Sequence, residues 1–284
     1  MQLPGPDFPA PAKLNLFLHV IGRRADGYHL LQSAFVLIDR CDLLRFRVRA
    51  DGVVARVNDL PGVAPEEDLV VRAAKALKAA SGSPLGADIE LEKRIPLGGG
   101  LGGGSSDAAT TLVALDRLWS IQMGVQALAR IGLELGADVP FFLFGRNAWA
   151  EGVGEQLSAL QVPPAWYVVL TPPQAVPTHS VFAAAELTRD TEALKMEDFS
   201  ARPEDPKFRN DLERVVVSRH PVVAEHLEWL ARYGKARMTG SGSCVFASFK
   251  SREEAGRVID ALPAGMKGFV ARGLEQHPLR ESVF

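Results

Sequence analysis

The sequence predicts an α+β protein of two domains, a mixed α/β domain over residues 1–160 and a ferredoxin-like domain over residues 161–284. Three observations support this prediction. The chain has 284 residues, and about 150 residues per domain is a usual size. The segment Gln161-Val-Pro-Pro164 interrupts the pattern near the middle. Beyond it, apart from extra helices, strands and helices follow in the β-α-β-β-α-β order of a ferredoxin-like fold.

The first half begins with an alternating strand in which Leu14, Leu16 and Leu18 share one face. Helical spacing at 67–80 ends at Ser81-Gly82, a typical helix stop. The remaining patterns predict strands at 12–21, 33–39, 43–50 and 87–95, helices at 105–119 and 124–135, and a hairpin of 147–151 with 155–160.

The second half alternates short strands with helices. Its patterns predict strands at 165–170, 236–239, 244–249 and 267–272, and helices at 179–187, within 209–231 and at 252–262.

Composition excludes several classes of protein. A formal net charge of −2 argues against a nucleic-acid-binding surface. No secretory signal pattern and no run of 18 apolar residues is present, so we expect a cytoplasmic protein with no membrane partner. Cys41 and Cys244 are expected to be reduced, and the histidines lack zinc-site spacing. We expect a monomer or a weak homodimer.

A glycine-rich loop is the most informative motif. Six glycines lie between Leu97 and Ser105, more than a turn requires, and a helix pattern follows at once. Glycine lets a ligand approach the backbone, and the first N–H groups of a helix attract anions. The predicted phosphate-binding residues are Pro96, Leu97, Gly98, Gly99, Gly100, Leu101, Gly102, Gly103, Gly104, Ser105 and Ser106.

The glycine loop also admits three other interpretations. The dinucleotide fingerprint fits formally, but several strands precede the loop and position 123, where an acidic residue is needed, is methionine. A Walker A motif needs a Gly-Lys-Ser/Thr sequence, and this loop has no lysine. A flexible linker capped by Ser105 or Ser106 remains possible on sequence alone, but phosphate binding is favoured.

Three separated segments resemble the motifs of the GHMP kinases: Pro11 to Leu16, the glycine loop, and Thr239 to Ser243. Two more, Arg24 to His29 and Gly136 to Phe141, resemble the branch that phosphorylates the 2-hydroxyl of 4-diphosphocytidyl-2-C-methyl-D-erythritol in the non-mevalonate isoprenoid pathway. The resemblance covers residues 11 to about 249. It implies the GHMP two-domain architecture, an ATP-dependent kinase with Mg²⁺, and a cytidylyl small-molecule substrate.

The same resemblance assigns the catalytic residues. Asp138 is the base that accepts the substrate hydroxyl's proton, and Lys13 steadies negative charge beside it. Asn15, on the same strand face as Lys13, is a candidate donor to a substrate phosphate. From the residues alone, Asp138 could instead cap a helix, Lys13 could be a solvated surface residue, and Asn15 an ordinary polar strand residue.

Tyr28 and His29 follow a turn dipeptide and suit a pyrimidine, since a ring can stack and an imidazole can hydrogen-bond the base edge. The resemblance places cytosine there, with Phe182 on its other face and Thr178 near the substrate. Phe182 could equally be core, and His29 a surface histidine. Thr239 to Ser243 forms either the floor of the site or only a tight turn.

No side chain is a firm metal ligand; Mg²⁺ is expected to arrive with ATP, and Ser105 or Ser106 could contact it. Asp68 departs from the Asn that the family more often carries, which leaves the nucleobase contacts of ATP open. Two alternative functions stay open: another GHMP kinase, of the homoserine or mevalonate type, and a nucleotide-binding module without catalysis. A nicotinamide oxidoreductase is disfavoured.

Overall fold

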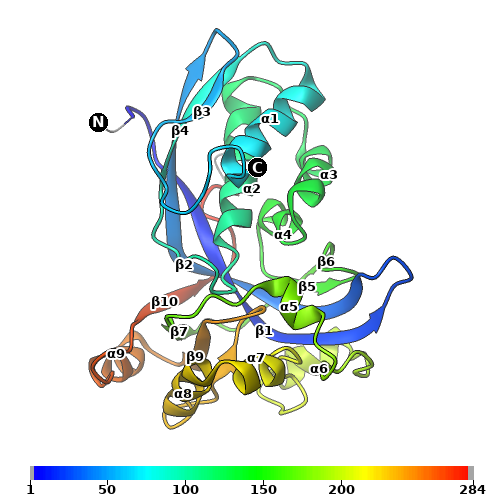
Figure 1. Cartoon of the computed structure of the whole chain (residues 1–284), viewed down its shortest axis with the longest axis vertical. Helices are drawn as coiled ribbons and strands as arrows, with labels where there is room; N and C mark the ends of the chain where they lie inside the picture. Colours follow the sequence, from blue (N-terminus) through cyan, green and yellow to red (C-terminus); the bar gives the residue numbers. More distant parts are fainter. Residues whose placement is uncertain (1–2, 281–284) are drawn as a thin grey trace.

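The computed structural model describes residues 3–280. The first part of the chain forms a set of strands with four helices packed against them (Figure 1). Its elements are β1 (Phe8–Arg23), β2 (His29–Arg49), β3 (Val54–Arg56), α1 (Leu69–Ser81), β4 (Gly86–Glu92), α2 (Gly103–Leu118), α3 (Val125–Leu135), α4 (Val139–Phe144), β5 (Ala148–Glu151) and β6 (Gln156–Ala159).

The second part lies below the first in Figure 1, and its helices α7, α8 and α9 form the lower edge of the molecule. Its elements are β7 (Trp166–Leu170), α5 (Thr178–Phe182), α6 (Met196–Ala201), α7 (Glu213–Arg219), α8 (Pro221–Leu230), β8 (Arg237–Met238), β9 (Val245–Phe249), α9 (Arg252–Asp260) and β10 (Gly268–Leu274).

Within the described residues a single hydrogen-bonded sheet runs through both parts in the order β3-β4-β2-β10-β7-β9-β8. Its last four strands are antiparallel and, with helices between β7 and β8 and between β9 and β10, have the connectivity of a ferredoxin-like fold. The predicted α+β class and its C-terminal ferredoxin-like half are therefore confirmed. The division at residue 160/161 stays a prediction, because β10 pairs with both β2 and β7.

The structure differs from the predicted elements in three places. The strands predicted at 33–39 and 43–50 are one strand, β2, whose pairing with β1 shifts register where Pro11 faces Cys41 and Ala12 faces Ile38. A bulge interrupts the alternation there without ending the strand. The helix predicted at 179–187 ends at Phe182, and the short elements β3, α4 and α6 were not predicted.

Three groups of buried apolar side chains form the core. One lies between α1–α4 and the strands β2 and β4, and a second lies under the helices of the C-terminal part. The third joins side chains of both parts, among them Phe17 of β1, Tyr167 of β7 and Phe246 of β9. Burial of apolar surface is the main stabilising term in folding, so this third group couples the two parts energetically.

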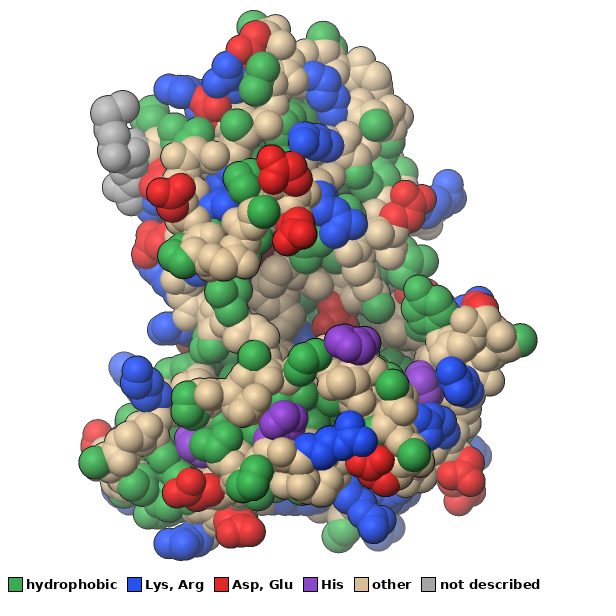
Figure 2. All heavy atoms as spheres, in the orientation of Figure 1, with side chains coloured by type: hydrophobic (Ala, Val, Ile, Leu, Met, Phe, Trp, Pro, Cys, Tyr) green, Lys and Arg blue, Asp and Glu red, His purple; other side chains and the backbone are tan. Residues whose placement is uncertain are grey.

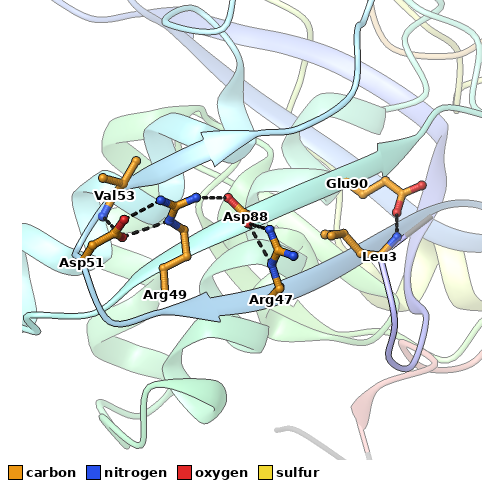
Figure 3. A network of polar contacts seen from close by, with 7 residues as sticks. All are labelled: Leu3, Arg47, Arg49, Asp51, Val53, Asp88 and Glu90. Carbon is orange, nitrogen blue, oxygen red and sulfur yellow. Dashed lines mark hydrogen bonds and ion pairs between the residues drawn. The ribbon is translucent and has the colours of Figure 1, made fainter. Parts of the chain in front are cut away.

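A polar network joins strands β2 and β4 of the N-terminal part (Figure 3). The buried carboxylate of Asp88 on β4 accepts hydrogen bonds from Arg47 and Arg49 of β2, and Arg49 also pairs with Asp51. Burial works to raise the pKa of Asp88, but the hydrogen bonds from Arg47 and Arg49 outweigh it and lower that pKa. Because the network lies on β2 and β4, away from the cleft residues named below, it is structural.

Candidate active site

A cleft of about 760 Å³ lies between the two parts of the chain, and Figure 2 shows the molecule hollowed at this height. Side chains from β1, the turn before β2, the glycine loop, α4 and α5 meet there. Of the residues predicted from the sequence, those lining the cleft are Lys13, Asn15, Tyr28, His29, Gly98, Gly100, Gly102, Ser105, Asp138, Thr178 and Phe182. Segments more than 200 residues apart in the chain, from Lys13 to Ser241, therefore share one cavity.

Lys13 and Asp138 lie side by side in the wall of the cleft. The Lys13 Nζ lies 3.5 Å from an Asp138 carboxylate oxygen, with the lysine side chain 3% exposed and the aspartate 35% exposed. Asp138 stands at the N-cap position of α4, yet its side chain makes no capping hydrogen bond. The carboxylate is therefore not used to cap the helix, and the lysine is not a solvated surface residue.

Neighbouring groups hold Lys13 in place. Its Nζ donates to Asn15 Oδ1 and lies 5.3 Å from the centre of the Phe35 ring. Asn15 in turn donates from Nδ2 to Ser33 Oγ at 2.9 Å, and its backbone N–H donates to Thr239 Oγ1 at 2.9 Å. A buried ammonium with fixed partners has little freedom to move, so the cation is directed at the cleft.

The glycine loop packs so tightly that side chains would not fit at several positions. A Cβ at Gly100 would lie 2.2 Å from the Thr239 carbonyl oxygen, and one at Gly102 would lie 2.9 Å from the Phe142 ring. Both residues also have positive φ, 75° and 72°, which disfavours other residue types. The loop is further tied to β1, because the Lys13 N–H donates to the Leu101 carbonyl at 3.0 Å.

The loop ends at the first turn of α2, whose N-cap is Gly102. Ser105 lines the cleft, whereas Ser106 is fully buried and its Oγ has no hydrogen-bond partner in the described residues. Two other predicted loop residues pack against the protein and do not line the cleft. Leu101 is buried in the third core group, and a Cβ at Gly99 would lie only 2.4 Å from Cys244 Sγ. The free N–H groups of the α2 N-terminus favour an anion in the cleft.

A buried ion cluster lies under the loop and was not predicted. The Lys93 Nζ bonds carboxylate oxygens of Asp42 and of Asp107, the latter at 2.7 Å. Asp42 also accepts the backbone N–H of Ile95 at 2.7 Å and of Arg94. Burial raises the pKa of Asp107 well above its ordinary value. The cluster thus fastens the strand end before the loop to the helix after it.

Tyr28, His29 and Phe182 meet at the other end of the cleft. Tyr28 is 65% exposed although aromatic, and its backbone N–H donates to Asp26 Oδ1 at 3.2 Å, which shapes the turn. The His29 and Phe182 rings lie 5.0 Å apart at 32°. An exposed aromatic ring that lines the same cleft as a second ring and an imidazole offers a surface on which a planar base can stack.

Burial, and then the nearby charges of Arg189 and Arg23, lower the pKa of His29 below its ordinary value. The imidazole is therefore neutral near pH 7 and has one N–H donor and one acceptor nitrogen. Thr178 shares a hydrogen bond of 2.7 Å with Ser241 Oγ, which joins α5 to the third glycine segment.

The segment Thr239 to Ser243 lies under the glycine loop. Thr239 is fully buried, and its Oγ1 lies 3.4 Å from the Gly100 carbonyl. Asn210, which the sequence analysis missed, donates to the Gly240 and Met238 carbonyls, each at 2.8 Å. Asn210 belongs to no motif and to no periodic pattern, so a single sequence does not indicate its role.

Asp68 does not line the cleft. Its Oδ1 accepts from the Val70 N–H and caps α1, while its Oδ2 lies 2.6 Å from Arg56 Nε. Both side chains are buried, so the negative charge that replaces the usual Asn is compensated within the protein.

No group of three or more His, Cys, Asp or Glu side chains in residues 3–280 is arranged to hold a metal ion. None of the helices in that range is both long and apolar enough to cross a bilayer.

Comparisons with known proteins show the family of the chain. The protein-family model "GHMP kinases N terminal domain" matches residues 68–146 of the chain, and the family model "GHMP kinases C terminal" matches residues 185–268. The chain is 59% identical over 274 residues to the 4-diphosphocytidyl-2-C-methyl-D-erythritol kinase of Aromatoleum aromaticum, covering 96% of this chain and 95% of that protein. It is also 59% identical to the enzyme of that name from Thiobacillus denitrificans, over 97% and 98% of the two chains.

Solved structures give the same result. A crystal structure of 4-(cytidine 5'-diphospho)-2C-methyl-D-erythritol kinase superposes with a TM-score of 0.81 at 38% identity, over 94% of this chain and 99% of that one. A homoserine kinase from Cytophaga hutchinsonii, at 17% identity over 98% and 97% of the chains and a TM-score of 0.70, shares the fold. The chain is therefore a GHMP kinase and belongs to the family of the 4-diphosphocytidyl-2-C-methyl-D-erythritol kinases.

Proposed function

We propose that this enzyme transfers the γ-phosphoryl group of ATP to the 2-hydroxyl of 4-diphosphocytidyl-2-C-methyl-D-erythritol. One observation supports this most directly: a single cleft holds a lysine–aspartate pair, a glycine loop at a helix N-terminus and an aromatic surface with a histidine. The high identity to kinases named for that substrate supports the same proposal over nearly the whole chain. The aromatic end of the cleft favours a substrate with a nucleobase over homoserine or mevalonate.

Each group has a task that follows from phosphoryl-transfer chemistry, in which the protein chiefly positions the reactants and stabilises charge. Asp138, partly exposed in the cleft, accepts the proton of the attacking hydroxyl. Lys13, beside it, stabilises the negative charge on the transferred phosphoryl group. Asn15, fixed by Ser33 and Thr239, holds Lys13 and offers an amide to a substrate phosphate.

The loop of residues 96–106 holds the ATP phosphates through backbone N–H groups of its glycines. Tyr28 and Phe182 stack the cytosine, and His29 reads its edge, with Thr178 near the substrate. These four side chains line the same cavity as Gly98, Gly100, Gly102 and Ser105 of the loop.

Mg²⁺ fits this site as a companion of ATP. Hard oxygen ligands suit it, and it usually keeps several waters while it binds substrate phosphates. The hydroxyls of the cleft-lining Ser105 and of the buried Ser106, whose Oγ has no partner in the described residues, would offer such oxygens at the start of α2. When bound, Mg²⁺ neutralises charge on the phosphates.

The proposed setting is the cytoplasm, with a small-molecule substrate and with the protein acting as a monomer or weak homodimer. The direct test is ADP release, coupled to a second enzyme, with ATP, Mg²⁺ and the cytidylyl substrate. We expect turnover that depends on this substrate. Equal turnover with homoserine or mevalonate would contradict the substrate assignment, and ATP binding without ADP release for any acceptor would indicate a non-catalytic module.

A further inference from the structure

Arg189 lies in the chain after α5 and has no role in the function described so far. Its Nε lies 3.1 Å from His29 Nε2 and donates a hydrogen bond to it. Its remaining N–H groups donate to the carbonyls of Leu187 at 3.0 Å, Phe182 at 2.9 Å and Ala184 at 2.6 Å. One guanidinium therefore joins the histidine and the phenylalanine of the base-binding end of the cleft.

The direction of the Arg189–His29 bond determines the state of the imidazole. Arginine has only donors and does not lose its proton in proteins. The His29 Nε2 must therefore accept, so this nitrogen carries no proton and the ring is neutral. The remaining ring proton is on Nδ1, which makes Nδ1 the one ring donor that His29 can offer to a ligand.

A fixed donor distinguishes the two common pyrimidines. On the Watson–Crick edge, N3 of cytosine is an acceptor, whereas N3 of uracil carries a hydrogen and is a donor. A protein N–H donor that faces N3 can therefore form a hydrogen bond with cytosine. With uracil the same donor faces the N3–H group, which is also a donor, and no hydrogen bond forms. Discrimination arises because the mismatched polar groups are left unpaired in a desolvated site.

We propose that Arg189 is a positioning residue that makes the site selective for cytosine over uracil, by holding His29 as the Nδ1–H tautomer and by fixing the Phe182 wall beside it. This proposal rests on the proposed function for the identity of the base. The three carbonyl bonds also hold the segment after α5, which the sequence predicted as helix to residue 187, because the carbonyls of Phe182, Ala184 and Leu187 all accept from Arg189.

The first test needs no enzymatic activity. In ¹⁵N-histidine-labelled wild-type protein without substrate, the His29 ring is expected to show a protonated Nδ1 and an unprotonated Nε2. His29→Gln identifies the signal. Arg189→Met should shift the ring toward a tautomer mixture, whereas Arg23→Gln, which removes the other nearby positive charge, should leave Nδ1 protonated. A wild-type His29 that carries its proton on Nε2 overturns the proposal.

The second test measures base choice by competition binding of CDP and UDP. Loss of one neutral hydrogen bond predicts that Arg189→Met reduces the preference for CDP by about 3- to 10-fold. In a protein that already carries His29→Ala, Arg189→Met should leave the ratio of the CDP and UDP affinities unchanged, because Arg189 affects base choice through His29. An equal loss of preference in that background would show that Arg189 acts only through the fold, and would contradict the proposal.

The two proposals can fail separately. A preference for CDP with the expected tautomer but no ADP release would reject the kinase assignment alone. ADP release with the cytidylyl substrate and an Nε2-protonated His29 would reject the role of Arg189 alone.

Discussion

At the scale of single residues, Asp138 combines two features that rarely occur together by chance. It occupies a helix N-cap position without capping the helix, and it keeps a partly exposed carboxylate 3.5 Å from a buried lysine ammonium. A buried lysine is costly unless it has a partner or a function. The pair is thus better explained by chemistry than by stability.

Asp138→Asn is therefore expected to lower kcat by about 10²- to 10⁴-fold, the usual contribution of a general base. The geometry is preserved, so the Kd for ATP should change little. Single-turnover kinetics and ATP titration measure the two quantities. Asp260→Asn, an exposed aspartate at the end of α9, is the matched control and should retain activity. Wild-type turnover in Asp138→Asn would remove this residue from the mechanism.

At the scale of elements, the glycine loop is held at both of its ends. Asp42 of β2 binds backbone N–H groups just before the loop, and Lys93 connects Asp42 to Asp107 in α2. Burial works to lower the pKa of Lys93, but the charges of Asp107 and Asp42 outweigh it and raise that pKa, so the lysine stays charged. A glycine-rich segment has high conformational entropy when free, so this cluster explains how it keeps one shape.

Lys93→Met should be strongly destabilising, because it leaves two buried carboxylates without their cation. Removing one partner of a buried ion pair costs about 3–5 kcal/mol. Urea unfolding measures the loss, and Lys75→Met, at an exposed position of α1, should change stability by no more than about 0.5 kcal/mol. Adding Asp107→Asn to Lys93→Met should recover part of the loss; no recovery would show that the carboxylates were not the cause.

At the scale of the whole molecule, the two halves share a sheet and a core. Strand β10, near the C-terminus, pairs with β2 of the first half, and the third core group contains side chains from both halves. Inter-domain interfaces within a chain usually resemble transient protein–protein interfaces and are fairly polar. This one resembles the interior of a single domain, and the cleft between the halves rests on it.

The halves are therefore expected to unfold together. Each contains two tryptophans, Trp119 and Trp149 in the first and Trp166 and Trp229 in the second. Variants that retain only one of these pairs, with Phe at the other two positions, should give fluorescence transitions in urea that coincide with each other and with the circular dichroism transition. Transitions that separate would indicate that the halves fold as independent domains.

Local patterns in the amino-acid sequence were enough to predict much of this protein. Hydrophobic periodicity predicted most strands and helices, and the order of elements after residue 164 predicted the ferredoxin-like half. The glycine run indicated a phosphate loop because that residue type has few other uses at such density. These signals are local, since they depend on the spacing of residues within one segment.

Contacts between distant segments appear only in the folded chain. The resemblance placed Lys13 beside Asp138, but no motif connects the residues of the Lys93 cluster under the loop or the contact of Arg189 with His29. Arginine, lysine and aspartate at isolated positions look like surface residues in a sequence, because solvent exposure is their usual state. Their partners are brought near only by the folding of the sheet, which no single segment encodes.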